Sequence, residues 1–82
     1  MMLRKYILNQ IKQTDLAENL YTVAKQFALK KIYNEMIDSG CEAKEYIDEF
    51  ISNQMKNLYA GDEYNDLKLL AFENIRQELK RI

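Results

Sequence analysis

The 82 residues include 12 basic and 13 acidic side chains, for a formal charge of −1, and 48% of the residues are apolar. A chain this short buries only about two-thirds of its unfolded surface, which leaves room for one core, and its apolar content excludes a disordered tail. We therefore expect a single domain over residues 1–82 without the overall basic field that attracts nucleic acid.

Residues that break helices are scarce. The chain has no proline and only two glycines, Gly40 and Gly61, so it lacks most of the turn signals that sheets and turn-rich folds require. The sequence therefore predicts an all-α fold, a small antiparallel helical bundle of three long helices plus a short N-terminal helix.

The first expected helix covers residues 2–12. Its residues Leu3, Ile7 and Ile11 follow one another at four-residue steps, so they lie on one face of a helix. This spacing predicts a short amphipathic helix.

A second helix is expected to begin at Asp15 and to end near Asp38. Asp15 and Glu18 have the spacing of a capping box, in which each side chain accepts from a free backbone amide. Gly40 follows the expected end, and glycine adopts the left-handed conformation there without steric cost. A turn of only Ser39–Cys41 then predicts an antiparallel hairpin with the next helix.

The third expected helix covers residues 42–59, because Ser39 and Glu42 again have capping-box spacing. Gly61 should end it, and Asp62 should cap a fourth helix that runs to the C-terminus. Apolar residues gather on one side of the third helix: Ala43, Tyr46, Ile47, Phe50, Ile51, Met55, Leu58 and Tyr59.

The second helix carries two apolar stripes about 150° apart around its axis. The first comprises Leu16, Leu20, Val23, Ala24, Phe27 and Ala28, and the second comprises Leu29, Ile32, Tyr33, Met36 and Ile37. A break near residues 28–31, a helix between different neighbours, or a second subunit over one half would each explain them. Without Gly or Pro to break it, we favour an unbroken helix whose first half contacts the first helix and whose second half contacts the other two, with a homodimer as the alternative.

No residue pattern indicates catalysis, a cofactor or a metal site. The chain has no histidine, which removes the usual general base and the usual partner of a nucleophile. Cys41 has no cationic cluster beside it and is interpreted as a structural turn residue. The acids Glu42, Glu45, Asp48 and Glu49 suit a helix N-terminus without forming a metal site. We expect a protein that is not an enzyme.

Nucleic-acid and membrane binding are both disfavoured. A helix-turn-helix would make residues 42–59 the recognition helix, whose first turns are acidic and would repel phosphates. The apolar runs are far shorter than the roughly 20 residues that cross a bilayer, and the N-terminus does not resemble a signal peptide. We expect a cytoplasmic protein.

Aromatic residues indicate interaction instead. The chain has six tyrosines and three phenylalanines, and such side chains often anchor interfaces because they offer large area with few rotors to order. Apolar side chains at the edges of the stripes, or on the second stripe, are the candidate partner-binding residues: Tyr21, Leu29, Tyr33, Leu69 and Phe72. The alternative is that the edge residues pack around the rim of the core, and we favour that alternative for Tyr21 and Phe72.

Elimination therefore favours a small inhibitor or regulator that docks on a larger protein, with a dimeric nucleic-acid-associated accessory protein as the alternative. In size, helical pattern and lack of catalytic residues the chain is similar in general character to bacteriocin immunity bundles and to small inhibitors of phages and mobile elements, including anti-CRISPR proteins. That similarity of type implies a protein partner.

Overall fold

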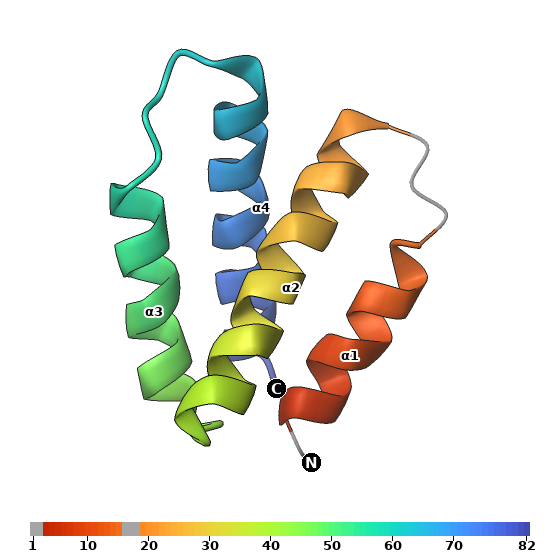
Figure 1. Cartoon of the computed structure of the whole chain (residues 1–82), viewed down its shortest axis with the longest axis vertical. Helices are drawn as coiled ribbons and strands as arrows, with labels where there is room; N and C mark the ends of the chain where they lie inside the picture. The colour runs from red at the N-terminus through yellow and green to blue at the C-terminus, as the bar shows by residue number, and fades with distance from the viewer. Residues whose placement is uncertain (1–2, 16–18) are drawn as a thin grey trace.

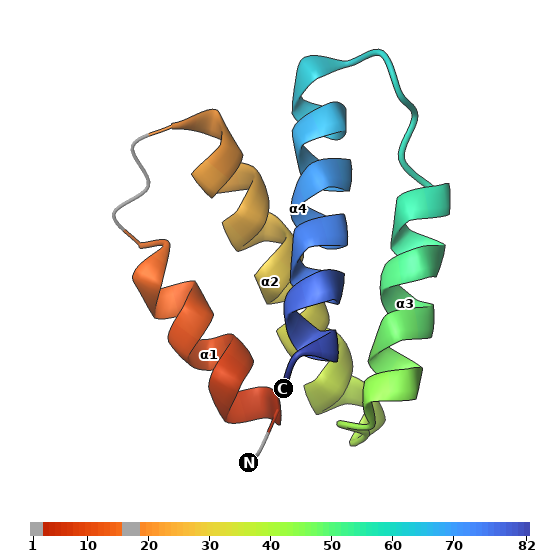
Figure 2. The same cartoon turned by 180° about the vertical axis from the view of Figure 1, so that it is seen from behind.

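The computed structural model describes residues 3–15 and 19–82, which form an all-α fold. Its helices are α1 (Leu3–Gln13), α2 (Leu20–Ser39), α3 (Lys44–Lys56) and α4 (Glu63–Lys80), as Figure 1 shows. Consecutive helices run in opposite directions, whereas α2 and α4 run in the same direction (Figures 1 and 2). The predicted antiparallel bundle with a short N-terminal helix is confirmed.

All four helices contribute to one hydrophobic core. The cluster comprises Leu3, Ile7, Ile11, Ala28, Leu29, Ile32, Met36, Ile47, Ile51, Ala71, Phe72, Ile75 and Leu79. The predicted α1 stripe is confirmed, because all three of its residues are buried. Each fully buried large side chain stabilises the fold by roughly 1.5–3 kcal/mol relative to an exposed one.

The predicted start of α2 at Asp15 is wrong. The helix begins after Asn19, whose side-chain Oδ1 accepts from the backbone amide of Thr22 at 2.8 Å. Thr14 still belongs to the last turn of α1, because its amide and hydroxyl both donate to the carbonyl of Ile11. Asp15 accepts instead from Gln26 at 2.9 Å, and its expected capping partner, Glu18, lies outside the described residues.

Gly40 ends α2 as predicted. Its φ is 68°, in the left-handed region, and its amide donates to the carbonyl of Met36 at 2.9 Å. α3, however, begins only at Lys44, and the predicted capping box is wrong, because the Ser39 hydroxyl accepts from the amide of Cys41 at 3.1 Å. The Glu42 carboxylate accepts instead from the backbone amide of Arg4 at 2.8 Å, so the α2–α3 turn caps the start of α1.

The connection between α3 and α4 is longer than predicted. α3 ends at Lys56, so the residues expected to form its last turn belong to the loop. Asp62 occupies the N-cap position of α4 as predicted, but its side chain accepts no capping hydrogen bond. Asp66, one turn into the helix, accepts from the amide of Gly61 at 3.2 Å.

α2 is unbroken and contacts the three other helices, as we favoured. The predicted division of its neighbours is wrong, because α4 also contacts the first half. Asn74 donates to the Tyr21 hydroxyl at 2.8 Å, and Lys25 forms an ion pair with Glu78 at 3.4 Å.

The two predicted stripes of α2 are largely one stripe that drifts around the helix. Ala24, Ala28, Ile32 and Met36 are all buried, and residues four apart advance by about 40° around a helix axis. Three such steps turn the buried face by about 120° between the ends of this set. One straight helix can therefore bury both halves within a single chain.

Candidate interaction surface

Burial separates the candidate partner-binding residues into two groups. Leu29 and Phe72 are 1% and 0% exposed, so they are core residues and cannot contact a partner of the folded chain. For Phe72 this burial agrees with the core position that we favoured, whereas for Leu29 it corrects the selection, because helical position alone does not show which helices cover a residue. Tyr21, Tyr33 and Leu69 are half-buried and remain accessible at the surface.

The three accessible candidates do not form one patch. Tyr21 and Tyr33 both pack against the core from α2, but they stand 12 residues apart, about 18 Å along a helix. The Tyr21 hydroxyl is also engaged with Asn74. The third, Leu69, belongs to α4, so the predicted set identifies partly exposed positions rather than a site.

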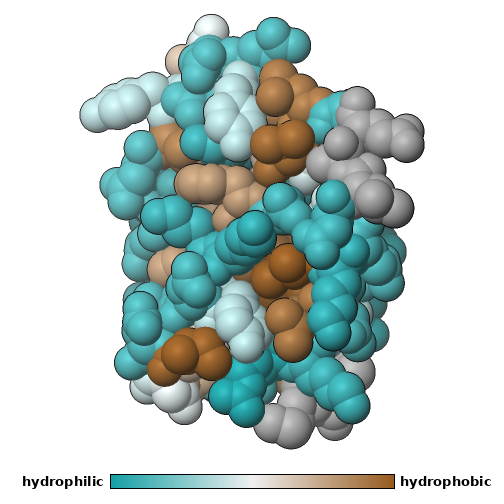
Figure 3. Space-filling model, turned by 45° about the vertical axis from the view of Figure 1, so that its right-hand side comes forward, coloured by the Kyte–Doolittle hydropathy of each residue, from teal (hydrophilic) through white to brown (hydrophobic). Residues whose placement is uncertain are grey.

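The start of α2 carries exposed aliphatic side chains that we had assigned to the core stripe. Leu20 is 44% exposed and Val23 is 41% exposed. The half-buried Phe27 follows Leu20 by seven residues and Val23 by four, so all three share one side of α2. Figure 3 shows apolar side chains reaching the surface at the end of the molecule where α2 begins, and again farther down this face.

Two lysines surround the aromatic ring on this side of α2. The Lys68 ammonium, from α4, lies 4.1 Å from the centroid of the Phe27 ring and 4.4 Å from that of Tyr64. Lys31, one turn after Phe27, lies 5.5 Å from the same Phe27 centroid. Each such cation–π contact is worth about 0.5–1 kcal/mol at an exposed site. We call Leu20, Val23, Phe27, Lys31, Tyr64 and Lys68 the α2–α4 patch.

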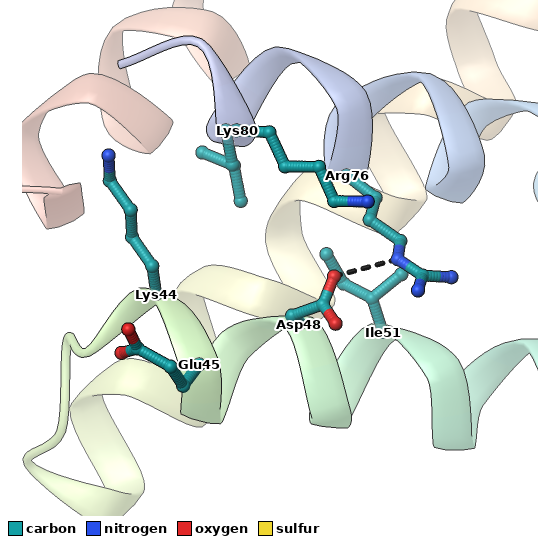
Figure 4. A pocket seen from close by; sticks show the side chains of 7 residues that line it. Lys44, Glu45, Asp48, Ile51, Arg76 and Lys80 are labelled. Carbon is teal, nitrogen blue, oxygen red and sulfur yellow. Dashed lines mark hydrogen bonds and ion pairs between the residues drawn. The ribbon is translucent and has the colours of Figure 1, made fainter.

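A cleft of about 270 Å³ lies between α3 and α4 (Figure 4). Asp48 and Arg76 bridge the two helices through an ion pair, with 2.7 Å between Oδ1 and Nε. The lining combines three cations, two carboxylates and two aliphatic side chains: Lys44, Arg76, Lys80, Glu45, Asp48, Ile51 and Leu79. Arg76 and Asp48 are engaged with each other, so the main role of this ion pair is to hold α3 against α4.

Two tyrosines have shifted acidity, and neither becomes a base at neutral pH. The Tyr46 hydroxyl donates to the Glu35 carboxylate, and this hydrogen bond raises the pKa of the phenol. Burial, followed by the nearby Glu78 carboxylate, raises the pKa of Tyr6. Both phenols therefore stay protonated well above neutral pH, and Tyr46 serves as a hydrogen-bond donor.

Within residues 3–15 and 19–82, no three or more Cys, Asp and Glu side chains are grouped so that they could hold a metal ion. Cys41, partly buried in the α2–α3 turn, is a free thiol. No helix in this part of the chain combines the length and the apolar character needed to cross a membrane. Comparisons with protein-family models, curated proteins and solved structures find no match.

Proposed function

We propose that this chain is a non-enzymatic protein-interaction module, an inhibitor or regulator that docks on a larger protein. The observation that carries the proposal is the exposure of Leu20 and Val23 on the first turns of α2. These two side chains are presented to solvent, although the same helix supplies five buried residues to the interior.

Such side chains favour association because their remaining exposed surface can be removed from water. Burial of apolar surface contributes about 25 cal/mol per Å², and a rigid helix loses little backbone entropy when it binds. Leu20 and Val23 are held on a helix whose first turn is fixed by the Asn19 cap. The α2–α4 patch thus offers a preformed contact surface.

The chemistry of the chain supports a binding role. It has no histidine, and the raised pKa values of Tyr6 and Tyr46 keep both phenols protonated. The α3–α4 cleft contains Asp48 and Arg76, but they are paired with each other. An inhibitor that acts by binding needs no catalytic side chains. The general similarity in size and helical pattern to phage inhibitors and immunity bundles also fits this role.

A dimeric nucleic-acid-associated protein is the second candidate function. It is retained because the residue types of the α2–α4 patch, lysines beside aromatic rings, recur in single-strand binding sites, although their arrangement fits a carboxylate partner better. Light scattering would report a dimer in this case, and retention on DNA would fall steeply with salt concentration.

The test compares the wild-type protein with a Leu20→Glu/Val23→Glu variant in cross-linking and affinity purification from the cells that carry the gene. We expect a protein retained by the wild type to fall at least tenfold in the variant and to withstand nuclease treatment. A Lys5→Glu variant on α1 serves as the control, and circular dichroism verifies the fold of each protein. Equal retention by wild type and double variant would contradict the proposal.

A further inference from the structure

We infer that the docking surface is the α2–α4 patch and that its occupant is an acidic segment of a partner protein. An apolar side chain of that segment would contact Leu20 and Val23, and its carboxylates would bind Lys31 and Lys68. This inference rests on the proposed function and adds the chemistry of the partner.

Charge is distributed unevenly along α2. From Leu20 to Asn34 the chain has three lysines and no acidic residue. Lys25 is neutralised by Glu78, whereas Lys31 and Lys68 take part in none of the ion pairs found among residues 3–15 and 19–82. The patch therefore presents cations that complement carboxylates from outside the molecule.

The position of Lys68 is constrained before any partner binds. Its ammonium lies within 4.4 Å of two ring centroids, and its side chain is half-buried. Ordering a lysine side chain costs up to about 2 kcal/mol of conformational entropy, and contact with the rings of Phe27 and Tyr64 meets part of that cost in the free protein. A carboxylate would therefore encounter a largely positioned cation.

The same geometry disfavours nucleic acid as the occupant. Bases bind aromatic residues by stacking on an open ring face, but Lys68 already covers the rings of Phe27 and Tyr64. α4 also begins with acidic residues, Glu63 and Asp66 in its first turn, which would repel a phosphate backbone. A carboxylate partner avoids the first conflict, because it needs only the ammonium groups and not an open ring face. The second conflict is smaller for a short acidic segment, which brings only a few carboxylates near Glu63 and Asp66 instead of a continuous row of phosphates.

Helical spacing gives the occupant a dimension. Leu20, Val23, Phe27 and Lys31 follow one another at three- and four-residue steps, so they form a row along one side of α2. Val23 and Lys31 are eight residues apart, about 12 Å at the rise of an α-helix. The complementary segment would carry its apolar anchor and its carboxylates about that distance apart.

The probe for the test is a synthetic helical peptide with a leucine pair and a glutamate pair spaced two turns apart. Titrated into ¹⁵N-labelled protein, it should shift the amides of residues 20–34 and 64–71, with affinity that falls as salt rises. A Lys31→Gln/Lys68→Gln variant should bind at least tenfold more weakly. A single Lys68→Arg variant keeps the cation at this position and should bind the peptide with most of the wild-type affinity.

Three controls make the outcome decisive. Lys5→Gln/Lys12→Gln on α1 removes the same charge and should leave peptide affinity unchanged. Polyglutamate without leucines should bind more weakly than the peptide, and oligothymidylate should not bind the patch. No peptide binding, tighter binding of oligothymidylate, or equal loss in both double variants would overturn the inference. A protein partner could be lost on Leu20→Glu/Val23→Glu but retained by Lys31→Gln/Lys68→Gln. That result would support the proposed function and overturn the inference that the occupant is acidic.

Discussion

The two halves of α2 carry similar residues in different surroundings. In the first half, Leu20 and Val23 are 44% and 41% exposed, whereas Leu29 and Ile32 in the second half are 1% and 0% exposed. The second half lies close to the α2–α3 turn, where Glu42 reaches the start of α1 and Tyr46 of α3 contacts Glu35. The neighbouring helices therefore decide which apolar residues of α2 are core and which are surface.

The largest expected effect comes from placing the same charge in each half. Leu29→Glu would bury a carboxylate without a partner, which costs several kcal/mol, comparable to the whole stability of a small domain. We expect this variant to lose its helical circular dichroism signal, whereas Val23→Glu should stay folded within about 1 kcal/mol of wild type.

Light scattering of the same proteins tests the homodimer alternative. We expect the wild type to have the mass of one chain, because Leu29 is covered by its own helices. A dimer that Leu29→Glu converts into a folded monomer would contradict this burial and would place the second half of α2 between subunits.

A smaller effect is expected where the α2–α3 turn, which follows the second half of α2, meets α1. Glu42→Ala removes the acceptor for the Arg4 amide and should reduce the free energy of unfolding by about 1–2 kcal/mol. Urea denaturation measures this loss. Amide hydrogen exchange in the variant should increase most, relative to wild type, in the first turn of α1. Glu42→Gln keeps an acceptor oxygen and should retain most of the stability; an equal loss in both variants would show that the charge, rather than the hydrogen bond, matters.

The smallest effect concerns the contact between α3 and the second half of α2. Glu35 raises the pKa of Tyr46 above its ordinary value of 10.0, so the folded state favours the protonated phenol. The stability from this contact is fully present below about pH 10 and is lost as pH rises through the folded pKa. Tyr46→Phe should therefore be slightly less stable than wild type near neutral pH, and the difference should shrink above pH 10.

Urea denaturation at pH 7, 9 and 11 measures that difference. Tyr59→Phe is the matched control, because it removes one of the six tyrosines at a position that is 85% exposed. A stability difference between Tyr46→Phe and wild type that does not change with pH would show that the Glu35 contact does not favour the protonated phenol.

Much of the fold could be predicted from local pattern. The α1 stripe and the helix end at Gly40 follow from four-residue spacing and from the conformational freedom of glycine, both of which act within one or two turns. The cap of α2 was missed because Asp15 and Asn19 are both acceptable capping residues. Asn19 is the cap in the structure, and Asp15 directly follows Thr14, whose amide still belongs to the last turn of α1.

The candidate surface was less predictable because exposure depends on tertiary packing. Helical position grouped Leu20 and Val23 with the core, since no local signal shows that the neighbouring helices leave them uncovered. The same reasoning offered Leu29 and Phe72 as surface candidates, although both are buried. The contact of Lys68 with Phe27 joins residues 41 positions apart in the chain, and a reading of each helix alone cannot find it.

The hydrogen bond between Arg4 and Glu42 has a consequence for how the chain folds. The first turn of α1 has no acidic residue of its own, and its acceptor comes from a turn 38 residues away. α1 can form transiently alone, but its first turn gains this acceptor only after α2 has turned back toward α3. Protection of the Arg4 amide should therefore appear together with the tertiary structure, making a local helix end a reporter of global folding.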